Sequence, residues 1–180
     1  MDSIKKLQPP LTETDVELLK AGDEVLISGV IYTARDMAHK RLCKAIEAGQ
    51  ELPFVLDGAI VYFVGPSPAP EGKIIGAAGP TTSSRMDTFS LTLLANGLKA
   101  MLGKGYRGQQ VRDALKKYKA VHLSTIGGAG ALLSKHIVAT EIIAYDDLGT
   151  EAIRKLQVFD FPAVVAYDCY RNSVYKEGER

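Results

Sequence analysis

The sequence has 180 residues, of which 46% are hydrophobic and 24% are charged, and its formal net charge is +1. This composition is that of an ordinary globular protein, and the length predicts one domain that can bury a sizeable core. A net charge so close to zero gives no electrostatic reason to expect nucleic acid or an anionic membrane as a partner.

The sequence also lacks the signals of membrane insertion, secretion and disulfide bonding. No apolar run approaches the ~18 residues needed to span a bilayer, and residues 1–7 lack the apolar core of a signal peptide. The two cysteines, Cys43 and Cys169, form neither a disulfide framework nor a CxxC motif. We therefore expect a cytoplasmic protein with reduced thiols.

Hydrophobic periodicity and turn residues predict strands that alternate with helices along the chain. In chain order the predicted elements are an N-terminal arm (1–20), a strand (23–32), a helix (to Gly49), a turn and strand (56–65), a proline-rich loop (66–70), a strand (73–78), a helix (86–98), a short strand (99–103), a helix (109–118), a strand (120–126), a short helical segment (to His136), a β-branched stretch (137–145), a short helix (148–156), a core strand (161–168) and a polar tail. The pattern predicts an α/β domain with a mixed sheet layered against helices. Its expected limits are residues 21–170, between the arm and a polar tail at 171–180.

Two of the predicted helices begin with the spacing of a capping box. Thr33 is followed three residues later by Asp36, and Ser84 is followed three residues later by Asp87. The second of these predicts a helix that starts near Arg85. Its free backbone N–H groups would favour an anion beside the run of four hydroxyl residues that precedes it.

Three loops share one arrangement, in which a strand leads into a loop that carries a cation and then into a helix. The cations are Arg35, Arg85 and Lys104. If the strands are parallel, all three loops lie at the carboxyl edge of the sheet, where open α/β sheets bind ligands. Two arginine forks and a lysine would suit a small dianion such as a dicarboxylate. The alternative is three unrelated surface cations.

The remaining chemical features favour structural roles. The glycine-rich loop at residues 127–130 does not match GxGxxG in phase, so close backbone packing or the approach of a partner or ligand explains it better than a nucleotide. The three histidines, His39, His122 and His136, are widely spaced, which argues against a metal site made by this chain alone. Both cysteines are expected to pack as small hydrophobic residues.

Five runs of residues carry a resemblance to a known family. They are residues 27–39, 79–87, 104–107, 124–129 and 159–163, of which the Gly-Pro-Thr-Thr…Arg-Met-Asp run at 79–87 is the most specific. In order and spacing they resemble the β subunit, or the equivalent C-terminal region, of the iron–sulfur (class I) fumarase and L-tartrate dehydratase family. The resemblance implies a swivelling β/β/α domain and reversible hydration of a C4 dicarboxylate. It also implies a 4Fe-4S cluster bound by three cysteines in an α subunit, and none in this chain.

The resemblance also implies roles for particular residues. Arg35, Arg85 and Lys104 correspond to contacts with the substrate carboxylates, and Thr81 corresponds to the catalytic base. The implied catalytic set is Thr81, Lys104 and His39, with His39 in a supporting role. A threonine hydroxyl is a weak base, so it would need nearby cations to stabilise its alkoxide. Many single-chain members differ from this chain at three positions, Ser83, Ser84 and Tyr106, which leaves the substrate preference open.

These expectations amount to a β subunit that hydrates fumarate to (S)-malate together with a cluster-carrying α subunit, as a hetero-oligomer. A homodimer is the alternative for the isolated chain. L-tartrate dehydration is the alternative reaction. A non-catalytic anion-binding module of the same fold is the alternative class. Retention of Thr81, Arg85 and Lys104 together favours the enzyme, since an interaction module has no need of that set.

Overall fold

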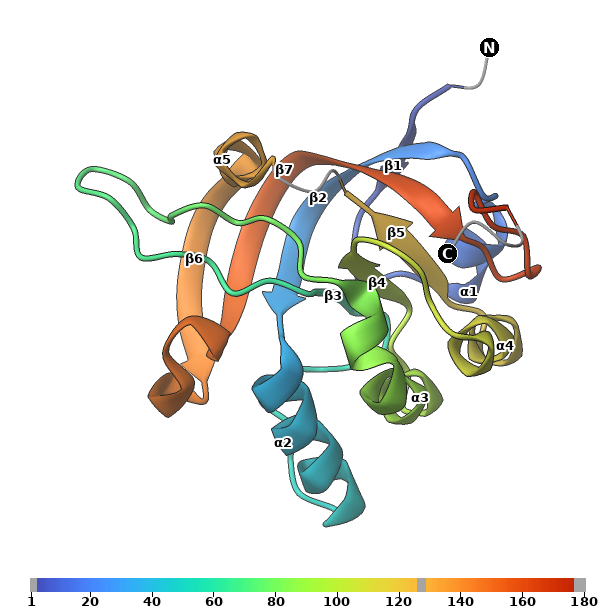
Figure 1. Ribbon diagram of the computed structural model, residues 1–180, viewed down its shortest axis with the longest axis horizontal. Coiled ribbons are helices and arrows are strands. Elements are labelled where there is room, and N and C mark those ends of the chain that lie inside the picture. Colours follow the sequence, from blue (N-terminus) through green and yellow to red (C-terminus); the bar gives the residue numbers. More distant parts are fainter. Residues whose placement is uncertain (1–2, 126–128, 177–180) are drawn as a thin grey trace.

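The computed structural model describes residues 3–125 and 129–176. It shows one mixed sheet of seven strands with helices packed on its outside (Figure 1). In chain order the elements are β1 (Lys5–Leu7), α1 (Glu13–Glu17), β2 (Glu24–Thr33), α2 (Asp36–Glu47), β3 (Ile60–Tyr62), the 3₁₀ turn η1 (Ser83–Met86), α3 (Asp87–Ala95), β4 (Ala100–Gly103), α4 (Gln109–Tyr118), β5 (Val121–Ser124), α5 (Gly130–Leu133), η2 (Ser134–His136), β6 (Ile137–Ala144), η3 (Asp146–Glu151) and β7 (Ile153–Tyr167).

The sheet closes on itself through its last strand. β2, β3, β4 and β5 lie parallel in that order, and β7 runs antiparallel to both β5 and β2. These five strands therefore form a closed barrel. β1 extends β2 in parallel, and β6 extends β7 in an antiparallel pairing. The predicted α/β class with a mixed sheet is confirmed.

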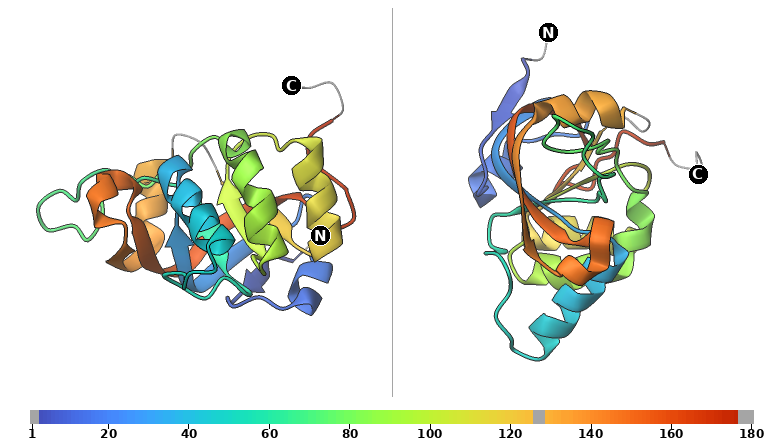
Figure 2. Two further views of the ribbon diagram at one scale, coloured as in Figure 1. Left: turned by 90° about the horizontal axis from the view of Figure 1, so that it is seen from below. Right: turned by 90° about the vertical axis from the view of Figure 1, so that its left-hand side faces the viewer.

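Two hydrophobic cores hold the fold together. The first fills the barrel, because apolar residues alternate inward along each strand; among its fully buried members are Ile27, Ile31, Leu102, Leu123, Phe161 and Val165. The second lies between the sheet and the helices and includes Leu42, Phe63, Met86, Leu94, Met101 and Leu115. Helices α2, α3 and α4 lie side by side over this second core (Figure 2, left). None of the helices in residues 3–125 and 129–176 is long and apolar enough to cross a membrane.

The prediction of a strand at residues 73–78 is wrong. This segment belongs to a long loop that projects from the barrel (green, left in Figure 1). The two sides of the loop are held together locally: the Ser67 N–H donates to the Ala77 carbonyl at 3.0 Å, and the Ala77 N–H donates to the Ser67 hydroxyl at 2.9 Å. A Cβ on Gly76 would lie 2.2 Å from the Ser67 carbonyl oxygen, so a glycine permits this close crossing. Of the apolar residues that suggested a strand, Ile75 and Ala78 are buried in the first core, whereas Ile74 is exposed.

The helix predicted at residues 148–156 is also wrong. A 3₁₀ segment occupies Asp146–Glu151, and β7 has already begun at Ile153. β7 is 15 residues long, so the predicted strand at residues 161–168 covers only its second half. Its pairings with β2 and with β6 both contain irregular register shifts, which break the alternation by which a strand is recognised.

Neither predicted capping box forms. α2 starts after Arg35 without a side-chain cap, because the Thr33 hydroxyl donates to the Ala152 carbonyl at 3.3 Å and accepts from Arg154. The 3₁₀ turn η1 precedes α3, whose first residue, Asp87, binds elsewhere. A capping box does form in the N-terminal arm, between Thr12 and Asp15 at the start of α1.

Candidate active site

The loops after β2, β3 and β4 share one edge of the sheet, since these strands are parallel. Backbone hydrogen bonds tie the strand ends together at this edge: Ala34 N to Tyr62 O at 3.0 Å, Phe63 N to Leu102 O at 2.8 Å and Thr125 N to Gly103 O at 3.0 Å. The parallel topology on which the prediction of a shared cation site depended is therefore present. We call this edge, with Arg35, Thr81, Arg85 and Lys104, the cationic rim.

Backbone contacts hold the segment 81–83 against the ends of β3 and β4. The Thr81 N–H donates to the Phe63 carbonyl at 2.7 Å, directly after β3. The Ser83 N–H donates to the Lys104 carbonyl at 2.8 Å, and Thr82 forms a parallel β-bridge with Lys104. The segment that follows the projecting loop is thus fixed to the ends of two barrel strands, which gives Thr81 a rigid support.

The Asp36 carboxylate holds Arg85 at the start of α2, next to Arg35 in the chain. Arg35 immediately precedes α2, and Asp36 is the first residue of that helix. The Asp36 Oδ2 atom accepts from Arg85 Nη2 at 3.0 Å and from Arg85 Nε at 3.2 Å. The Arg35 side chain passes Gly65, where a Cβ would lie 2.9 Å from Arg35 Cδ. Both predicted arginines therefore lie at the same rim, although they are 50 positions apart in the sequence.

His39 lies behind Arg35 and is completely buried. Its Nδ1 lies 2.9 Å from the Arg35 carbonyl oxygen, which can only accept, so Nδ1 carries the proton. The ring packs edge-on against Phe63, with 5.2 Å between centroids. Burial is the main cause that lowers the pKa of His39 from 6.5 to about 4. His39 is therefore neutral at physiological pH and supports the backbone of Arg35.

This burial predicts a loss of stability in acid. Between pH 6.5 and 4 the unfolded chain binds a proton at His39 that the folded chain does not, so the free energy of unfolding falls as the pH falls through this window. We expect His39 to account for about 2 kcal/mol of the difference between pH 7 and pH 5. Urea unfolding at both pH values should show this difference in the wild type and a correspondingly smaller one in His39→Gln. A His39 ring that titrates near 6.5 by NMR would contradict the prediction.

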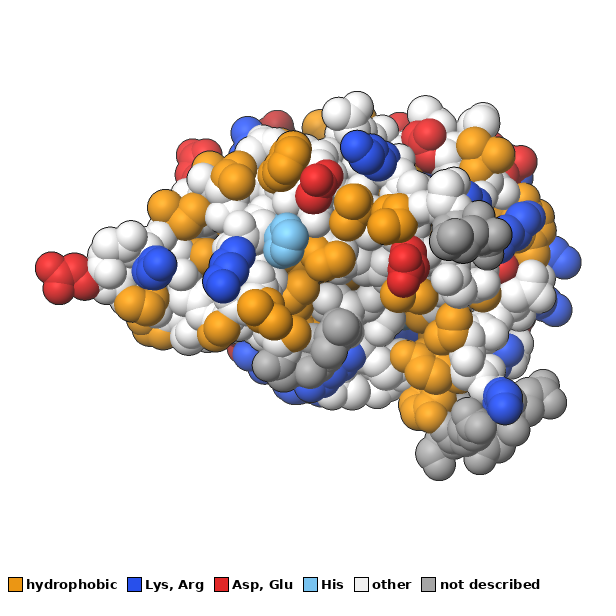
Figure 3. Space-filling view, turned by 90° about the horizontal axis from the view of Figure 1, so that it is seen from above, with side chains coloured by type: hydrophobic (Ala, Val, Ile, Leu, Met, Phe, Trp, Pro, Cys, Tyr) orange, Lys and Arg blue, Asp and Glu red, His pale blue; other side chains and the backbone are white. Residues whose placement is uncertain are grey.

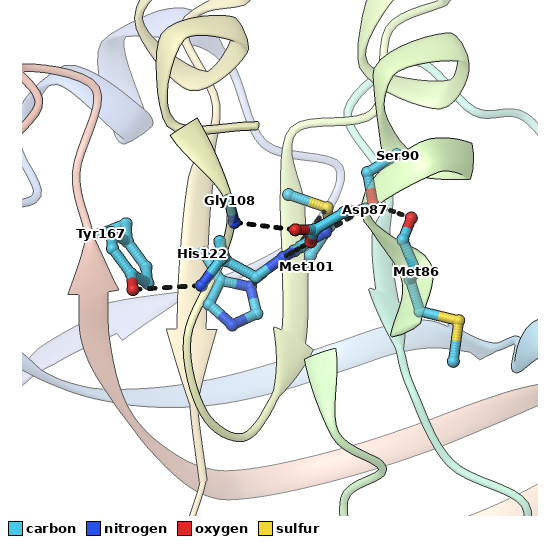
Figure 4. A network of polar contacts seen from close by, with 8 residues as sticks. Met86, Asp87, Ser90, Met101, Gly108, His122 and Tyr167 are labelled. Carbon is cyan, nitrogen blue, oxygen red and sulfur yellow. Dashed lines mark hydrogen bonds and ion pairs between the residues drawn. The ribbon is translucent and has the colours of Figure 1, made fainter. Parts of the chain in front are cut away.

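A buried arginine next to the rim was not predicted from the sequence. The Arg107 guanidinium donates to four side chains: the Asp87 carboxylate at 2.8 Å, the Ser90 hydroxyl at 2.6 Å, the His122 Nδ1 at 3.2 Å and the Met101 Sδ at 3.2 Å (Figure 4). The second Asp87 oxygen accepts from the Gly108 N–H at 2.7 Å. Burial, and then the Arg107 charge, lower the pKa of His122 well below 6.5, so its ring stays neutral. This network joins the starts of α3 and α4 to the barrel.

The glycine-rich loop is explained in part by close packing. A Cβ on Gly130 would lie 2.8 Å from the backbone nitrogen of Gly79, and the Ala78 N–H donates to the Gly130 carbonyl at 3.2 Å. The start of α5 therefore packs directly against the segment that leads to Thr81, as the close-packing prediction requires. Gly127 and Gly128 lie outside the described residues.

The donors on this chain do not fit an iron–sulfur cluster bound by three cysteines. The sequence contains two cysteines, and both are buried with free thiols. Cys43 lies on α2 and Cys169 follows β7, and burial raises the pKa of both thiols. Within residues 3–125 and 129–176, no three His, Cys, Asp or Glu side chains gather where they could hold a metal ion.

A separate apolar hollow lies on the face shown in Figure 3, where orange side chains gather. Its volume is about 500 Å³, and its lining includes Val25, Leu132, Leu133 and Val164. The hollow does not include the cationic rim, whose residues are absent from its lining. Arg85, with 50% of its side chain exposed, instead faces solvent at the end of the barrel where the parallel strands finish.

The fold and the rim define an α/β barrel domain that carries three cations and a threonine at the carboxyl ends of its parallel strands. Residues 3–178 match the family described as Fumarase C-terminus. The chain is 40% identical over 153 residues to "Fumarate hydratase class I, anaerobic" of Escherichia coli, covering 84% of this chain and 28% of that enzyme. It is 37% identical over 158 residues to "Fumarate hydratase 2" of Leishmania major, covering 87% of this chain and 28% of that enzyme.

The chain matches a third relative over most of that relative's length. The "Putative L(+)-tartrate dehydratase subunit beta" of Methanocaldococcus jannaschii is 36% identical over 173 residues, which cover 93% of this chain and 89% of that protein. The chain thus spans little more than a quarter of the two fumarate hydratases but most of a protein named as a subunit. The chain belongs to the fumarase C-terminus family, which confirms the resemblance seen in its sequence.

Proposed function

We propose that this chain is the β component of a hydro-lyase that hydrates fumarate reversibly to (S)-malate. The observation that carries the proposal is the cationic rim, in which the two residues after Thr81 pair with the backbone of Lys104 and both arginines lie at the same edge. A C4 dicarboxylate has two negatively charged ends, and arginine forks bind carboxylates well. The names of the relatives, fumarate hydratase and tartrate dehydratase, support a hydro-lyase.

In this proposal Arg35, Arg85 and Lys104 bind the carboxylates, and Thr81 transfers the proton. In the dehydration direction the Thr81 alkoxide removes a proton from the carbon next to a malate carboxylate, and hydroxide leaves from the neighbouring carbon. The negative charge that develops on the carboxylate is stabilised by the rim cations, which also favour the alkoxide over the neutral hydroxyl. His39 supports this set by holding the Arg35 carbonyl.

We propose further that a 4Fe-4S cluster belongs to a separate α-type component and that the two assemble as a hetero-oligomer. In the resembled family the cluster activates the substrate hydroxyl. Two features of this chain support the division: its cysteines do not fit such a cluster, and its rim is open to solvent at Arg85. A partner that closes the rim would exclude water and strengthen the electrostatic interactions with the substrate.

Dehydration of L-tartrate to oxaloacetate is the second candidate function. It is favoured by the tartrate dehydratase relative, of which this chain covers 89%, against 28% of the fumarate hydratases. Both substrates are C4 dicarboxylates, so the same cations would serve either reaction. Ser84 and Tyr106 are close to these cations in the sequence. They are therefore the first residues to substitute in a test of the preference between fumarate and L-tartrate.

The proposed function is tested by anaerobic assembly with an α subunit that carries three cluster cysteines. We expect no turnover by this chain alone, and turnover of fumarate or L-tartrate by the assembled pair. Full activity of the isolated chain without metal would contradict the proposal. An assembled, cluster-loaded pair that turns over neither substrate would contradict it as well.

A further inference from the structure

We infer that Asp36 is a positioning residue, which holds the Arg85 guanidinium in place for a substrate carboxylate. This inference rests on the proposed function. Asp36 Oδ2 accepts from Arg85 Nη2 at 3.0 Å and from Arg85 Nε at 3.2 Å. Because Asp36 directly follows Arg35 and begins α2, a rigid helix start connects the two arginines of the rim.

The contact leaves the substrate-binding edge of the arginine free. A guanidinium has five N–H donors, and Asp36 uses the side formed by Nε and Nη2. The end formed by Nη1 and Nη2 still presents the parallel pair of donors that grips a carboxylate. Asp36 therefore orients Arg85 without occupying the donors that a dicarboxylate needs.

Positioning matters here because the Arg85 side chain has no other hydrogen bond or ion pair among the described residues. Half of it is exposed, and a long side chain that is ordered only when the substrate arrives reduces the affinity by the rotamer entropy it loses. An ion pair that already fixes the guanidinium removes most of that loss. Preorganisation of this kind is what a site for a small, highly solvated dianion requires.

Stability alone does not explain the carboxylate. Ion pairs as exposed as this one contribute little to folding. The second carboxylate oxygen, Asp36 Oδ1, is buried and has no hydrogen-bond partner among the described residues, which is unfavourable. The dipole of α2 favours an acid at its first position, but that effect does not depend on Arg85.

Asp36→Asn and Asp36→Ala in the assembled enzyme test the inference. We expect KM for the dicarboxylate to rise about tenfold in Asp36→Ala, and less in Asp36→Asn, whose amide oxygen still accepts from Arg85. The kcat should stay within about threefold, because the proton transfer at Thr81 is untouched. The opposite role, a carboxylate that blocks Arg85, predicts a lower KM. Either a lower or an unchanged KM would overturn the inference.

A matched control is available on the same helix. Arg41 of α2 donates to Asp147 at 2.8 Å, so Asp147→Asn removes a carboxylate from another arginine and should leave KM unchanged. A second readout does not depend on activity. In the isolated chain, the Arg85 Nε–H group should be ordered by NMR relaxation in the wild type and mobile in Asp36→Ala. Equal mobility in both would refute the positioning role. Failure of the assembled wild type to turn over would instead refute the proposed function.

Discussion

Replacement of Thr81 by alanine is expected to lower kcat of the assembled enzyme on the order of 10³-fold, the usual contribution of a general base. Thr81 is held in the fold by its backbone N–H, which donates to the Phe63 carbonyl. That contact remains when the side chain is replaced. The urea midpoint and the KM should therefore change little. Steady-state kinetics of fumarate hydration, with urea unfolding of the same samples, measure both quantities.

Thr88→Ala provides the matched control for this experiment. Thr88 is exposed on α3, within the same stretch of chain, and is not part of the cationic rim. It should retain wild-type kcat. If kcat of Thr81→Ala also stays within a few-fold of the wild type, Thr81 does not transfer the proton.

Replacement of Arg107 by methionine is expected to destabilise the fold by about 3 kcal/mol. The substitution leaves Asp87, Ser90 and His122 without their common donor, and a broken buried ion pair costs 3–5 kcal/mol. We expect a loss at the lower limit of this range, about 3 kcal/mol, because a quarter of the Asp87 side chain is exposed and water can reach it. Urea unfolding of the isolated chain measures the change.

Two further variants separate this network from a general effect of losing a cation. Arg107→Met combined with Asp87→Asn should recover part of the lost stability, because the stranded charge is removed while an oxygen remains for the Gly108 N–H. Arg41→Ala removes an exposed ion pair and should leave the urea midpoint nearly unchanged. Equal losses in Arg107→Met and Arg41→Ala would show that the lost stability comes from removing a cation and not from breaking the buried network.

Local patterns were sufficient to predict several elements of the fold. The helix predicted at residues 109–118 coincides with α4, and the strand predicted at residues 23–32 differs from β2 by one residue at each end. Both have strong apolar periodicity and clear end signals, which depend only on neighbouring residues. Closure of the barrel depends instead on pairings such as Val25 with Ala163, across most of the chain, and local patterns do not encode those.

The capping predictions failed for a related reason. Asp36 and Asp87 have the spacing of capping residues, but each accepts from an arginine of a distant segment, Arg85 and Arg107 respectively. A carboxylate bound to a guanidinium has a charge on both partners, whereas a carboxylate bound to a backbone N–H has a charge on one, so the tertiary contact prevails. The sequence pattern singled out both acids, but it did not indicate which arginines they contact.

The same limit applies to the candidate site. Arg35, Arg85 and Lys104 could be nominated because each follows a stretch predicted as a strand, although the strand assigned before Arg85 was wrong. Their common edge follows from the parallel order of β2, β3 and β4, which the sequence suggested only as a condition. The contact of Asp36 with Arg85 and the buried position of His39 were seen only in the packed structure.

The central claim is that this chain supplies the cations and the base that act on the dicarboxylate. A crystal structure of the anaerobically assembled complex with bound malate tests it most directly. We predict that Arg35, Arg85 and Lys104 contact the two carboxylates at about 3 Å and that the Thr81 hydroxyl faces the carbon that loses its proton. Malate held entirely by the partner, with Thr81 out of reach of that carbon, would contradict the claim.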